Sequence, residues 1–424
     1  MGNVEWPRKS AEKSCGTRES LRYNISMQKQ ADVPERTPAR VHLAYLDGLR
    51  GLAALYVVAF HVLAYYFSHL NSIVTRIVTP LSFGSYAVGV FIVLSGFCLM
   101  LPVARSEDGL LRGGAKRFFL SRARRILPPY YFAVALSLLL IALFIGHKTG
   151  TPWDTSVPVT KIGLVSHLLM LQDISTATWA QIDSPLWSVS VEWRIYFCFP
   201  LLVLAWRRYG PWGTTAAAVA CAYVLVFAFW RIHFLFRFNS QQNGITPQYL
   251  GLFALGMLAA GIAFSEHPTL SLLRRRLPWG RLTAGMFLAL IAATATHPAF
   301  LKGRPGLDFF VGLFASCLLI AATRAGGWQK ALSWKPLVVG SFAYSLYLIH
   351  FPILQMVWQY LIHPLHLGVS ASLLLHWLLG IPISVGVAYG FHLAFERPFM
   401  SKPGKPAVRT ERQAEAAAIE SPAP

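Results

Sequence analysis

The sequence predicts an all-α fold: a polytopic membrane bundle of about ten transmembrane helices with both termini in the cytoplasm. Hydrophobic residues make up 55% of the 424-residue chain and charged residues only 13%, whereas a soluble surface needs roughly 25% charged residues. Ten apolar stretches approach the length that a bilayer core requires. Lys and Arg are concentrated in alternate connections between these stretches. Together these observations exclude a soluble globular protein.

The predicted spans follow one another through most of the chain. A helix needs about 20 apolar residues to cross a bilayer core, and the sixth and seventh stretches are short. The ranges are 50–68, 84–104, 127–146, 186–206, 213–236, 248–265, 281–297, 306–323, 338–362 and 369–395. We expect a membrane core at residues 41–399, between a flexible cytoplasmic segment at 1–40 and a disordered cytoplasmic tail at 400–424. Residues 1–40 lack the apolar stretch of a cleavable signal peptide.

The charge distribution predicts the orientation. The net charge is +20, from 38 Lys and Arg against 18 Asp and Glu. If the N-terminus is cytoplasmic, 29 of the 38 cations lie in inner segments and 7 in outer loops. The positive-inside rule then places both termini in the cytoplasm and favours an even number of spans in the inner or plasma membrane of the cell. Because the cations lie between apolar stretches, we expect no nucleic-acid partner.

The first span carries two ionisable side chains, Arg50 and His61. They are eleven residues apart, so on a helix they lie within ~20° of one another and ~16 Å apart along the axis. Ionisable groups inside a membrane usually face a cavity or a partner. An anion held by Arg50 at the cytoplasmic mouth could thus extend to His61 near the midplane. Alternatively, Arg50 reaches inner headgroups and His61 only bonds a neighbouring helix.

Two further spans bring acid–base groups to a similar depth. Glu192 lies ~9 Å below the outer end of the fourth span, and His350 lies midway along the ninth. Glu192 could form a structural pair with Arg194, or it could orient and assist a histidine base. Three helices converging on one layer favour a functional site.

The inner connection at residues 105–126 is strongly basic. It carries seven Lys and Arg residues, more than orientation alone requires. Forked guanidinium groups suit phosphates, and this connection lies on the same side of the membrane as Arg50. Binding to anionic lipid headgroups is the competing interpretation.

Six short motifs occur in order along the chain. They are 46–51 (LDGLRG), with His61 after ten intervening residues from Arg50, 89–97 (GVFIVLSGF), 122–128 (RARRILP), 186–192 (LWSVSVE), 344–350 (YSLYLIH) and 395–398 (FERP). With these motifs the chain resembles acyltransferase family 3 of integral-membrane O-acyltransferases, which includes bacterial lipopolysaccharide and exopolysaccharide O-acetylases. The resemblance covers residues 46–398. One departure is Trp193, where many relatives carry a second Glu.

The resemblance implies an acyl-CoA donor on the cytoplasmic side and a hydroxyl acceptor. It makes Arg50 and His61 the essential arginine–histidine pair, and Arg122 and Arg125 the paired-arginine motif beside it. His61 would be the base in a direct transfer or the acyl carrier in a two-step route. The candidate hydrogen-bond donors to the oxyanion of the tetrahedral intermediate are Tyr344, Ser345 and Ser95. The predicted catalytic residues are His61 and Glu192, and the predicted substrate-binding residues are Asp47, Arg50, Arg122, Arg125, Trp187, Tyr344, Ser345 and His350.

The predicted function is therefore transfer of an acyl group, acetyl being the expectation, from acyl-CoA to a sugar-containing or other small acceptor. Acyl-CoA is a co-substrate; we expect no bound cofactor and no metal, and the partners are the bilayer, acyl-CoA and the acceptor. The alternative is a proton-coupled transporter that uses the buried His and Glu as a relay, although the halves of the chain show no repeat. A lipid-binding scaffold would explain the cations but not the acid–base layer.

Overall fold

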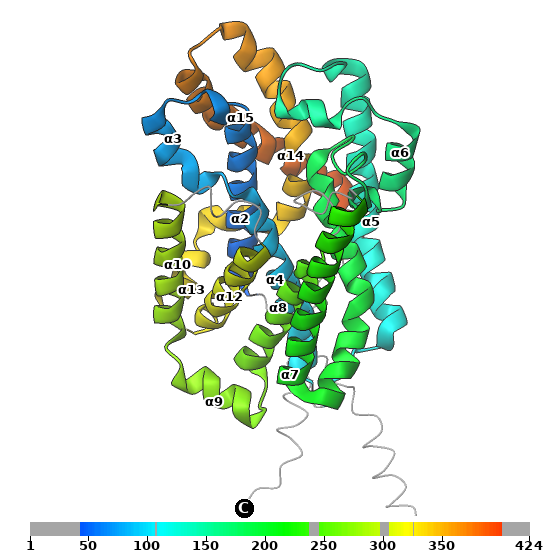
Figure 1. Ribbon diagram of the computed structural model, residues 1–424, viewed down its shortest axis with the longest axis vertical. Coiled ribbons are helices and arrows are strands. Elements are labelled where there is room, and N and C mark those ends of the chain that lie inside the picture. Colours follow the sequence, from blue (N-terminus) through cyan, green and yellow to red (C-terminus); the bar gives the residue numbers. More distant parts are fainter. Residues whose placement is uncertain (1–42, 107, 237–245, 297–304, 325, 401–424) are drawn as a thin grey trace, which may run out of the picture. The chain divides into compact units, whose positions relative to one another are not determined.

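The protein is described by a computed structural model over residues 43–106, 108–236, 246–296, 305–324 and 326–400, and within these ranges it is built from helices without a β-strand (Figure 1). The all-α prediction is confirmed for this part of the chain. The predicted terminal segments, residues 1–40 and 400–424, lie outside the described residues apart from Met400.

Long helices alternate with short ones. The long helices are α2 (Ala44–Ala64), α4 (Gly84–Ala104), α5 (Gly114–Leu140), α7 (Trp187–Phe236), α8 (Gln248–Phe264), α10 (Trp279–Thr296), α12 (Pro305–Ala322), α14 (Ala343–Val357) and α15 (Val369–Phe391). The short α-helices are α3 (Ser72–Val78), α6 (Lys161–Leu168), α9 (Pro268–Arg276) and α13 (Gly327–Leu332). Single turns extend or connect them: η1 (Phe67–His69), η2 (Thr79–Leu81), η3 (Ile141–Ile145), η4 (Pro152–Ser156), η5 (Gln172–Ile174), η6 (Ser184–Leu186), η7 (Lys335–Phe342), η8 (Trp358–Ile362), η9 (His363–Leu365), η10 (His392–Glu396) and η11 (Arg397–Phe399).

Each predicted span range contains helix. By length and composition, five helical stretches of the described chain are able to cross a membrane, or six if the bent pair α8–α9 counts as one. The two helices of that pair meet at 82°. Helices α10 and α12 are apolar but shorter. The protein therefore has several membrane-capable helices.

Helix α7 is one long run that breaks at Gly210. A membrane-capable stretch of 46 residues would be ~69 Å long as a straight helix, about twice the thickness of a bilayer core. Gly210 has φ 74°, in the left-handed region that glycine adopts at no steric cost, and Pro211 suits the first turn of the next helix. The break falls within the connection predicted at residues 207–212.

Helices α4 and α8 approach so closely that their backbones nearly touch. A side chain at Gly96 would overlap the carbonyl oxygen of Phe253, and one at Gly256 would overlap the carbonyl oxygen of Val93. Small residues permit such contact between membrane helices. This contact fixes α4 against α8 and sets the direction in which the rest of α4 points.

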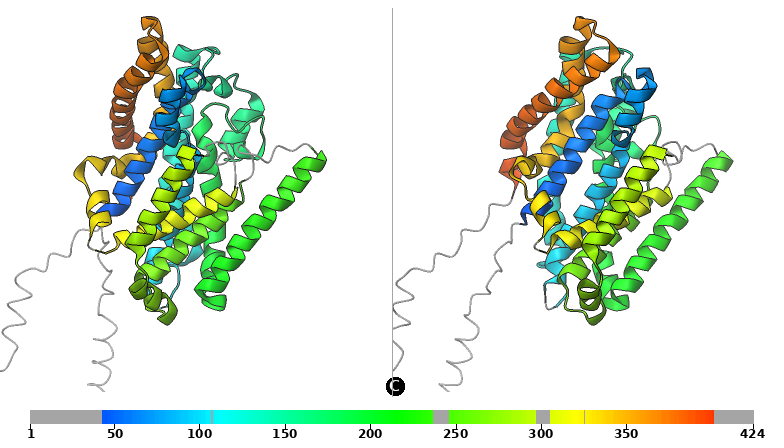
Figure 2. Two further views of the ribbon diagram at one scale, coloured as in Figure 1. Left: turned by 60° about the vertical axis from the view of Figure 1, so that its left-hand side comes forward. Right: turned by 90° about the vertical axis from the view of Figure 1, so that its left-hand side faces the viewer.

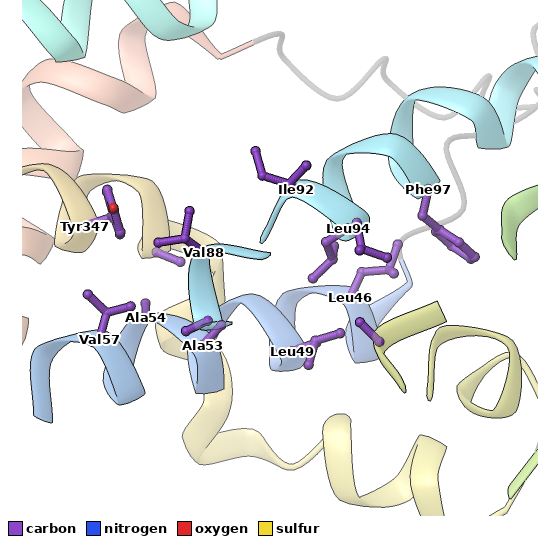
Figure 3. Packing of buried hydrophobic residues seen from close by; sticks show 14 of the residues in the cluster. Leu46, Leu49, Ala53, Ala54, Val57, Val88, Ile92, Leu94, Phe97 and Tyr347 are labelled. Atoms are coloured by element: carbon purple, nitrogen blue, oxygen red, sulfur yellow. The ribbon is translucent and has the colours of Figure 1, made fainter. Parts of the chain in front are cut away.

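Helix α2 lies inside the bundle and packs against α4, α14 and α15 (Figure 2). Figure 3 shows buried side chains of α2 and α4 in this contact, together with Tyr347 of α14. Helices α2 and α14, which carry Arg50, His61 and His350, are therefore neighbours in the structure.

Candidate functional site

Helices α2, α4, α5, α7 and α14, with the turns η7 and η10, enclose a cavity of about 150 Å³. We call it the arginine cavity. Its charged, hydroxyl and thiol lining residues are Arg50, Ser95, Cys98, Arg122, Arg125, Ser188, Glu192, Tyr196, Ser341, Tyr344, Tyr347 and Glu396. Among the described residues, no group of three or more His, Cys, Asp or Glu side chains is placed to hold a metal ion.

Three arginines bring positive charge to the arginine cavity. Arg50 donates from Nη1 to Oδ1 of Asp47 at 2.8 Å and from Nη2 to Sγ of Cys98 at 3.0 Å. Within the described residues, the side chains of Arg122 and Arg125 form no ion pair, and Nε of Arg122 is buried without a hydrogen-bond partner. A buried cation is costly unless it is paired. The wall therefore suits an anionic ligand.

Glu192 belongs to a hydrogen-bonded chain across the same cavity. The hydroxyl of Tyr196, one turn further along α7, donates to Oε1 of Glu192 at 2.5 Å. Because a phenol has a single hydrogen, Ser95 on α4 donates its own hydrogen to Tyr196 over 2.8 Å. Arg194 pairs with Asp173, so the structural pair of Glu192 with Arg194 that the sequence allowed does not form.

A second carboxylate, Glu396, lines the cavity from η10. It is 1% exposed, and its Oε2 accepts from Oγ of Ser345 at 2.5 Å and contacts Nδ1 of His392 at 2.8 Å. Ser345 itself is not among the lining residues. Its predicted contact with substrate remains a prediction, and in the structure it holds a cavity carboxylate.

Two tyrosines of α14 direct their hydroxyl groups differently. Tyr344 donates to the carbonyl oxygen of Ile126 at 3.0 Å. Tyr347 lies 3.1 Å from the carbonyl oxygen of Pro185 and 2.6 Å from Oγ of Ser188. One of the two hydroxyl hydrogens links Tyr347 to Ser188, and the other is donated to the carbonyl oxygen of Pro185, which both hydroxyls approach.

His61 and His350 contact each other rather than the arginine cavity. Nδ1 of His61 lies 3.0 Å from Nε2 of His350, and neither residue is among those lining the cavity. Tyr347 lines the cavity, and its ring centroid lies 5.8 Å from that of His350. Whether Arg50 and His61 share one substrate path therefore stays a prediction, and Tyr347 is the residue that connects their surroundings.

Two predicted substrate-binding residues lie beside the cavity lining. Asp47 orients Arg50 through their hydrogen bond. Trp187 is half-buried, and its ring stacks on that of Tyr249 with centroids 6.0 Å apart. Neither Asp47 nor Trp187 lines the arginine cavity.

Six polar cavity residues were not singled out from the sequence: Cys98, Ser188, Tyr196, Ser341, Tyr347 and Glu396. Three of them fall inside the motifs at 186–192, 344–350 and 395–398, so their positions were visible although their roles were not. Tyr196 stands four residues after Glu192, the spacing at which side chains on one helix meet.

The segment at residues 147–186 buries polar groups away from the cavity. The imidazole of His167 is fully buried, with Nδ1 2.8 Å from the carbonyl oxygen of Gly163. Asp183 is also fully buried; its Oδ2 accepts from Oγ of Ser137 at 3.0 Å, and its Oδ1 has no hydrogen-bond partner in the described part of the chain. Burial lowers the pKa of His167 to about 4 and raises the pKa of Asp183 well above its ordinary value. Because the pKa of His167 lies below neutral pH, its ring is uncharged near pH 7.

Comparison with known proteins identifies relatives of the whole membrane core. A family model described as an acyltransferase domain matches residues 43–393. The chain is similar to the acyltransferase MdmB of Streptomyces mycarofaciens, at 32% identity over 169 residues, which cover 39% of this chain and 40% of MdmB. It is similar to the O-acetyltransferase OatA of Staphylococcus aureus, at 23% identity over 335 residues, covering 75% of this chain and 52% of OatA.

A third relative is Nodulation protein 10 of Rhizobium leguminosarum bv. viciae, at 23% identity over 326 residues, covering 75% of this chain and 86% of that protein. The chain thus spans about half the length, or less, of MdmB and OatA. No solved structure matches the chain.

Proposed function

Since the chain belongs to the acyltransferase family, whose model spans residues 43–393, we propose that it is an integral-membrane O-acyltransferase. It moves an acyl group, acetyl in our proposal, from acyl-CoA to a hydroxyl of a sugar-containing acceptor. The name of the relative OatA, an O-acetyltransferase, supports the choice of acetyl and of oxygen as the accepting atom.

The proposal includes ten membrane crossings with both termini in the cytoplasm and residence in the inner or plasma membrane of the cell. The excess of Lys and Arg in alternate connections supports this orientation, as does the break of α7 at Gly210 into two halves. In this orientation, the end of α2 that carries Arg50 lies at the cytoplasmic face. Acyl-CoA, which is cytoplasmic, then meets the arginine cavity first.

One observation carries the donor proposal: three guanidinium groups line one cavity, and two of them, those of Arg122 and Arg125, form no ion pair within the described residues. Arg122 and Arg125 come from α5 and Arg50 from α2, and all three line the arginine cavity. Arginine binds phosphate through parallel hydrogen bonds, and the buried, unpartnered Nε of Arg122 is available for one. The phosphates of acyl-CoA supply the missing anions.

The reacting end of the donor lies toward His61, ~16 Å further along α2. His61 accepts the proton of the acceptor hydroxyl while the hydroxyl oxygen attacks the thioester carbonyl. A carbon–oxygen bond forms, the carbon–sulfur bond breaks, and the departing thiolate takes the proton back from His61. A base placed in this way contributes typically about 10²- to 10⁴-fold to the rate. Glu192, held by Tyr196, supplies negative charge beside the arginines and orients them.

The donor site is tested by charge-preserving substitution. The purified protein in lipid nanodiscs is incubated with tritiated acetyl-CoA, and bound label is measured. The double variant Arg122→Lys/Arg125→Lys should bind roughly tenfold or more weakly, because lysine cannot form paired hydrogen bonds with phosphate. Arg124 lies between them, is exposed and does not line the cavity, so Arg124→Lys is the matched control. Equal binding by the double variant and the control would contradict the proposal.

The reaction is tested at His61. In membranes of an expression host, His61→Ala should abolish transfer of tritium from acetyl-CoA to endogenous acceptors, while the purified variant still binds acetyl-CoA. Full transfer by the variant would overturn the assignment. Solute flux across reconstituted vesicles without acyl-CoA would instead favour a proton-coupled transporter.

A further inference from the structure

We propose that His350 is a positioning residue that, together with the carbonyl oxygen of Val57, holds His61 as the tautomer with hydrogen on Nδ1, and so leaves Nε2 of His61 as the basic atom. This inference rests on the proposed function, because it concerns how the base is prepared. In this inference the imidazole of His350 has one role, which is to hold the imidazole of His61 in place.

The hydrogen of His350 is assigned by its backbone neighbours. Nδ1 of His350 lies 2.8 Å from the carbonyl oxygen of Tyr347 and 3.1 Å from that of Leu346. A carbonyl oxygen only accepts hydrogen bonds, so Nδ1 must carry the hydrogen. A neutral imidazole has one N–H group, and Nε2 of His350 is therefore an acceptor.

The hydrogen of His61 follows from that result. Nδ1 of His61 lies 3.0 Å from Nε2 of His350 and 3.0 Å from the carbonyl oxygen of Val57. Both neighbours are acceptors, so Nδ1 of His61 carries the hydrogen and shares it between them. In the opposite tautomer, the lone pair of Nδ1 would face the lone pairs of both neighbours, and the hydrogen bonds to them would be lost.

His350, rather than the helix itself, distinguishes this histidine. His167 also has Nδ1 2.8 Å from the carbonyl oxygen four residues earlier, so a backbone acceptor at that spacing is not special to His61. What His61 has in addition is the imidazole of His350, which is fully buried. The ring of Phe351, with its centroid 5.1 Å away, packs against His61 as well.

Nε2 of His61 is left available. Within the described residues, no hydrogen-bond partner faces this atom, and His61 is only partly buried. The acceptor hydroxyl gives its proton to this Nε2 and later the thiolate of CoA removes it, so His61 ends the reaction in its starting tautomer. Throughout, Nδ1–H keeps donating to His350.

An uncharged partner for His61 suits its position inside the membrane. In a serine protease the orienting group of the histidine is a carboxylate, but an ionised carboxylate is expensive inside a membrane. An imidazole whose own hydrogen is fixed by two carbonyl groups offers the same acceptor without a charge. His350 therefore controls orientation and tautomer.

The first test observes the tautomer directly. Solid-state NMR of the ¹⁵N-histidine-labelled protein in lipid bilayers, with the His61 signals assigned by difference from His61→Gln, distinguishes protonated from bare ring nitrogens. We expect a protonated Nδ1 and a bare Nε2 for His61 in the wild type. A wild-type His61 with its hydrogen on Nε2 overturns the inference without any variant of His350.

The second test separates orientation from packing. His350→Phe retains a ring but removes the acceptor, and kcat should fall roughly a hundredfold with the KM for acetyl-CoA unchanged. His350→Gln places a side-chain oxygen near the position of Nε2, and should recover activity to within about tenfold of wild type. His147 is exposed, and His147→Phe serves as the control. Equal losses in the Phe and Gln variants, or full activity of the Phe variant, overturn the inference.

These outcomes are distinct from failure of the proposed function. If His61→Ala transfers acetyl groups normally, the base assignment fails and the role of His350 fails with it. If His61→Ala is inactive while His350→Phe is fully active, only the role of His350 fails.

Discussion

The arginine cavity and the segment at residues 147–186 both bury polar groups, but they differ in how the arginines beside them are paired. In the cavity, Arg122 and Arg125 have no acidic partner among the described residues. At the 147–186 segment, Arg194 is paired with Asp173, which is 1% exposed. An arginine that is already paired with a carboxylate contributes structure, whereas one that faces a cavity without such a partner is available to an anionic ligand.

A similar contrast separates His61, near the cavity, from His167 and Asp183 in the 147–186 segment. Near the cavity, Nε2 of His61 has no hydrogen-bond partner among the residues that the structure describes, while in the 147–186 segment His167 and Asp183 are fully buried. Enclosed groups influence folding, and their titration changes the free energy of unfolding. Accessible groups influence the reaction, and a substitution that removes one of them lowers the rate of turnover. The two regions should thus respond to substitution through different measurements.

The largest expected effect is on the Arg194–Asp173 pair. Arg194→Met leaves the buried Asp173 carboxylate without its partner, and such losses cost about 3–5 kcal/mol. The thermal unfolding midpoint of the protein in detergent should fall strongly, and adding Asp173→Asn should restore most of the loss. Acetyl transfer per folded molecule should stay normal. Arg122→Met is the matched substitution in the cavity: if it destabilises as much as Arg194→Met, the contrast between the regions fails.

The next effect is acid destabilisation through His167. Its pKa of about 4 lies below the ordinary value of 6.5 because burial disfavours the charged ring. Between pH 4 and pH 6.5 the unfolded chain therefore binds a proton at His167 that the folded chain does not bind. This contribution to stability is complete above pH 6.5 and is lost as the pH falls to 4, in total about 3 kcal/mol.

The measurement compares thermal midpoints at pH 7.5 and pH 4.5. His167→Asn retains a donor near the carbonyl oxygen of Gly163 but cannot titrate, so its midpoint should depend less on pH than that of the wild type. An equally steep dependence in both proteins would show that other groups govern acid unfolding.

A third effect concerns donor affinity at Arg50. Arg50→Gln removes one charged hydrogen-bond donor from the phosphate site, and such bonds contribute about 1.5–3 kcal/mol. The KM for acetyl-CoA should rise between roughly tenfold and a hundredfold, with a smaller rise for Arg50→Lys. A lower kcat at unchanged KM would instead place Arg50 in the chemical step.

Much of the helical framework could be predicted from hydropathy and charge. The break of α7 at Gly210 lies within the predicted connection, and each predicted range contains helix. The family predicted from the six motifs is confirmed by the match over residues 43–393. Composition and turn residues suffice here because lipid constrains helix length and because glycine and proline act locally.

The partners of the functional side chains were harder to predict. The sequence placed Arg50, Arg122, Arg125, Glu192 and Tyr344 in a site, and all five line one cavity. It did not show that His61 bonds His350, or that Ser345 holds Glu396. Such pairings depend on the rotation of each helix about its axis and on close contacts such as that between α4 and α8. A single sequence contains no direct record of either.

The smallest effect tests the enclosed carboxyl group of Asp183. Burial raises its pKa, so its stabilising contribution is complete below the unfolded value near 3.9 and is lost as the pH rises through the folded value. Asp183→Asn cannot ionise and can still accept from Ser137. Its unfolding midpoint should therefore exceed that of the wild type by about 2 °C or more near pH 8, with the difference shrinking toward pH 4. Acetyl transfer should not change, because the group is closed off from the arginine cavity. A variant that unfolds normally but has lost transfer would instead assign Asp183 to the reaction, and the distinction between enclosed and ligand-facing polar groups would no longer separate the two regions.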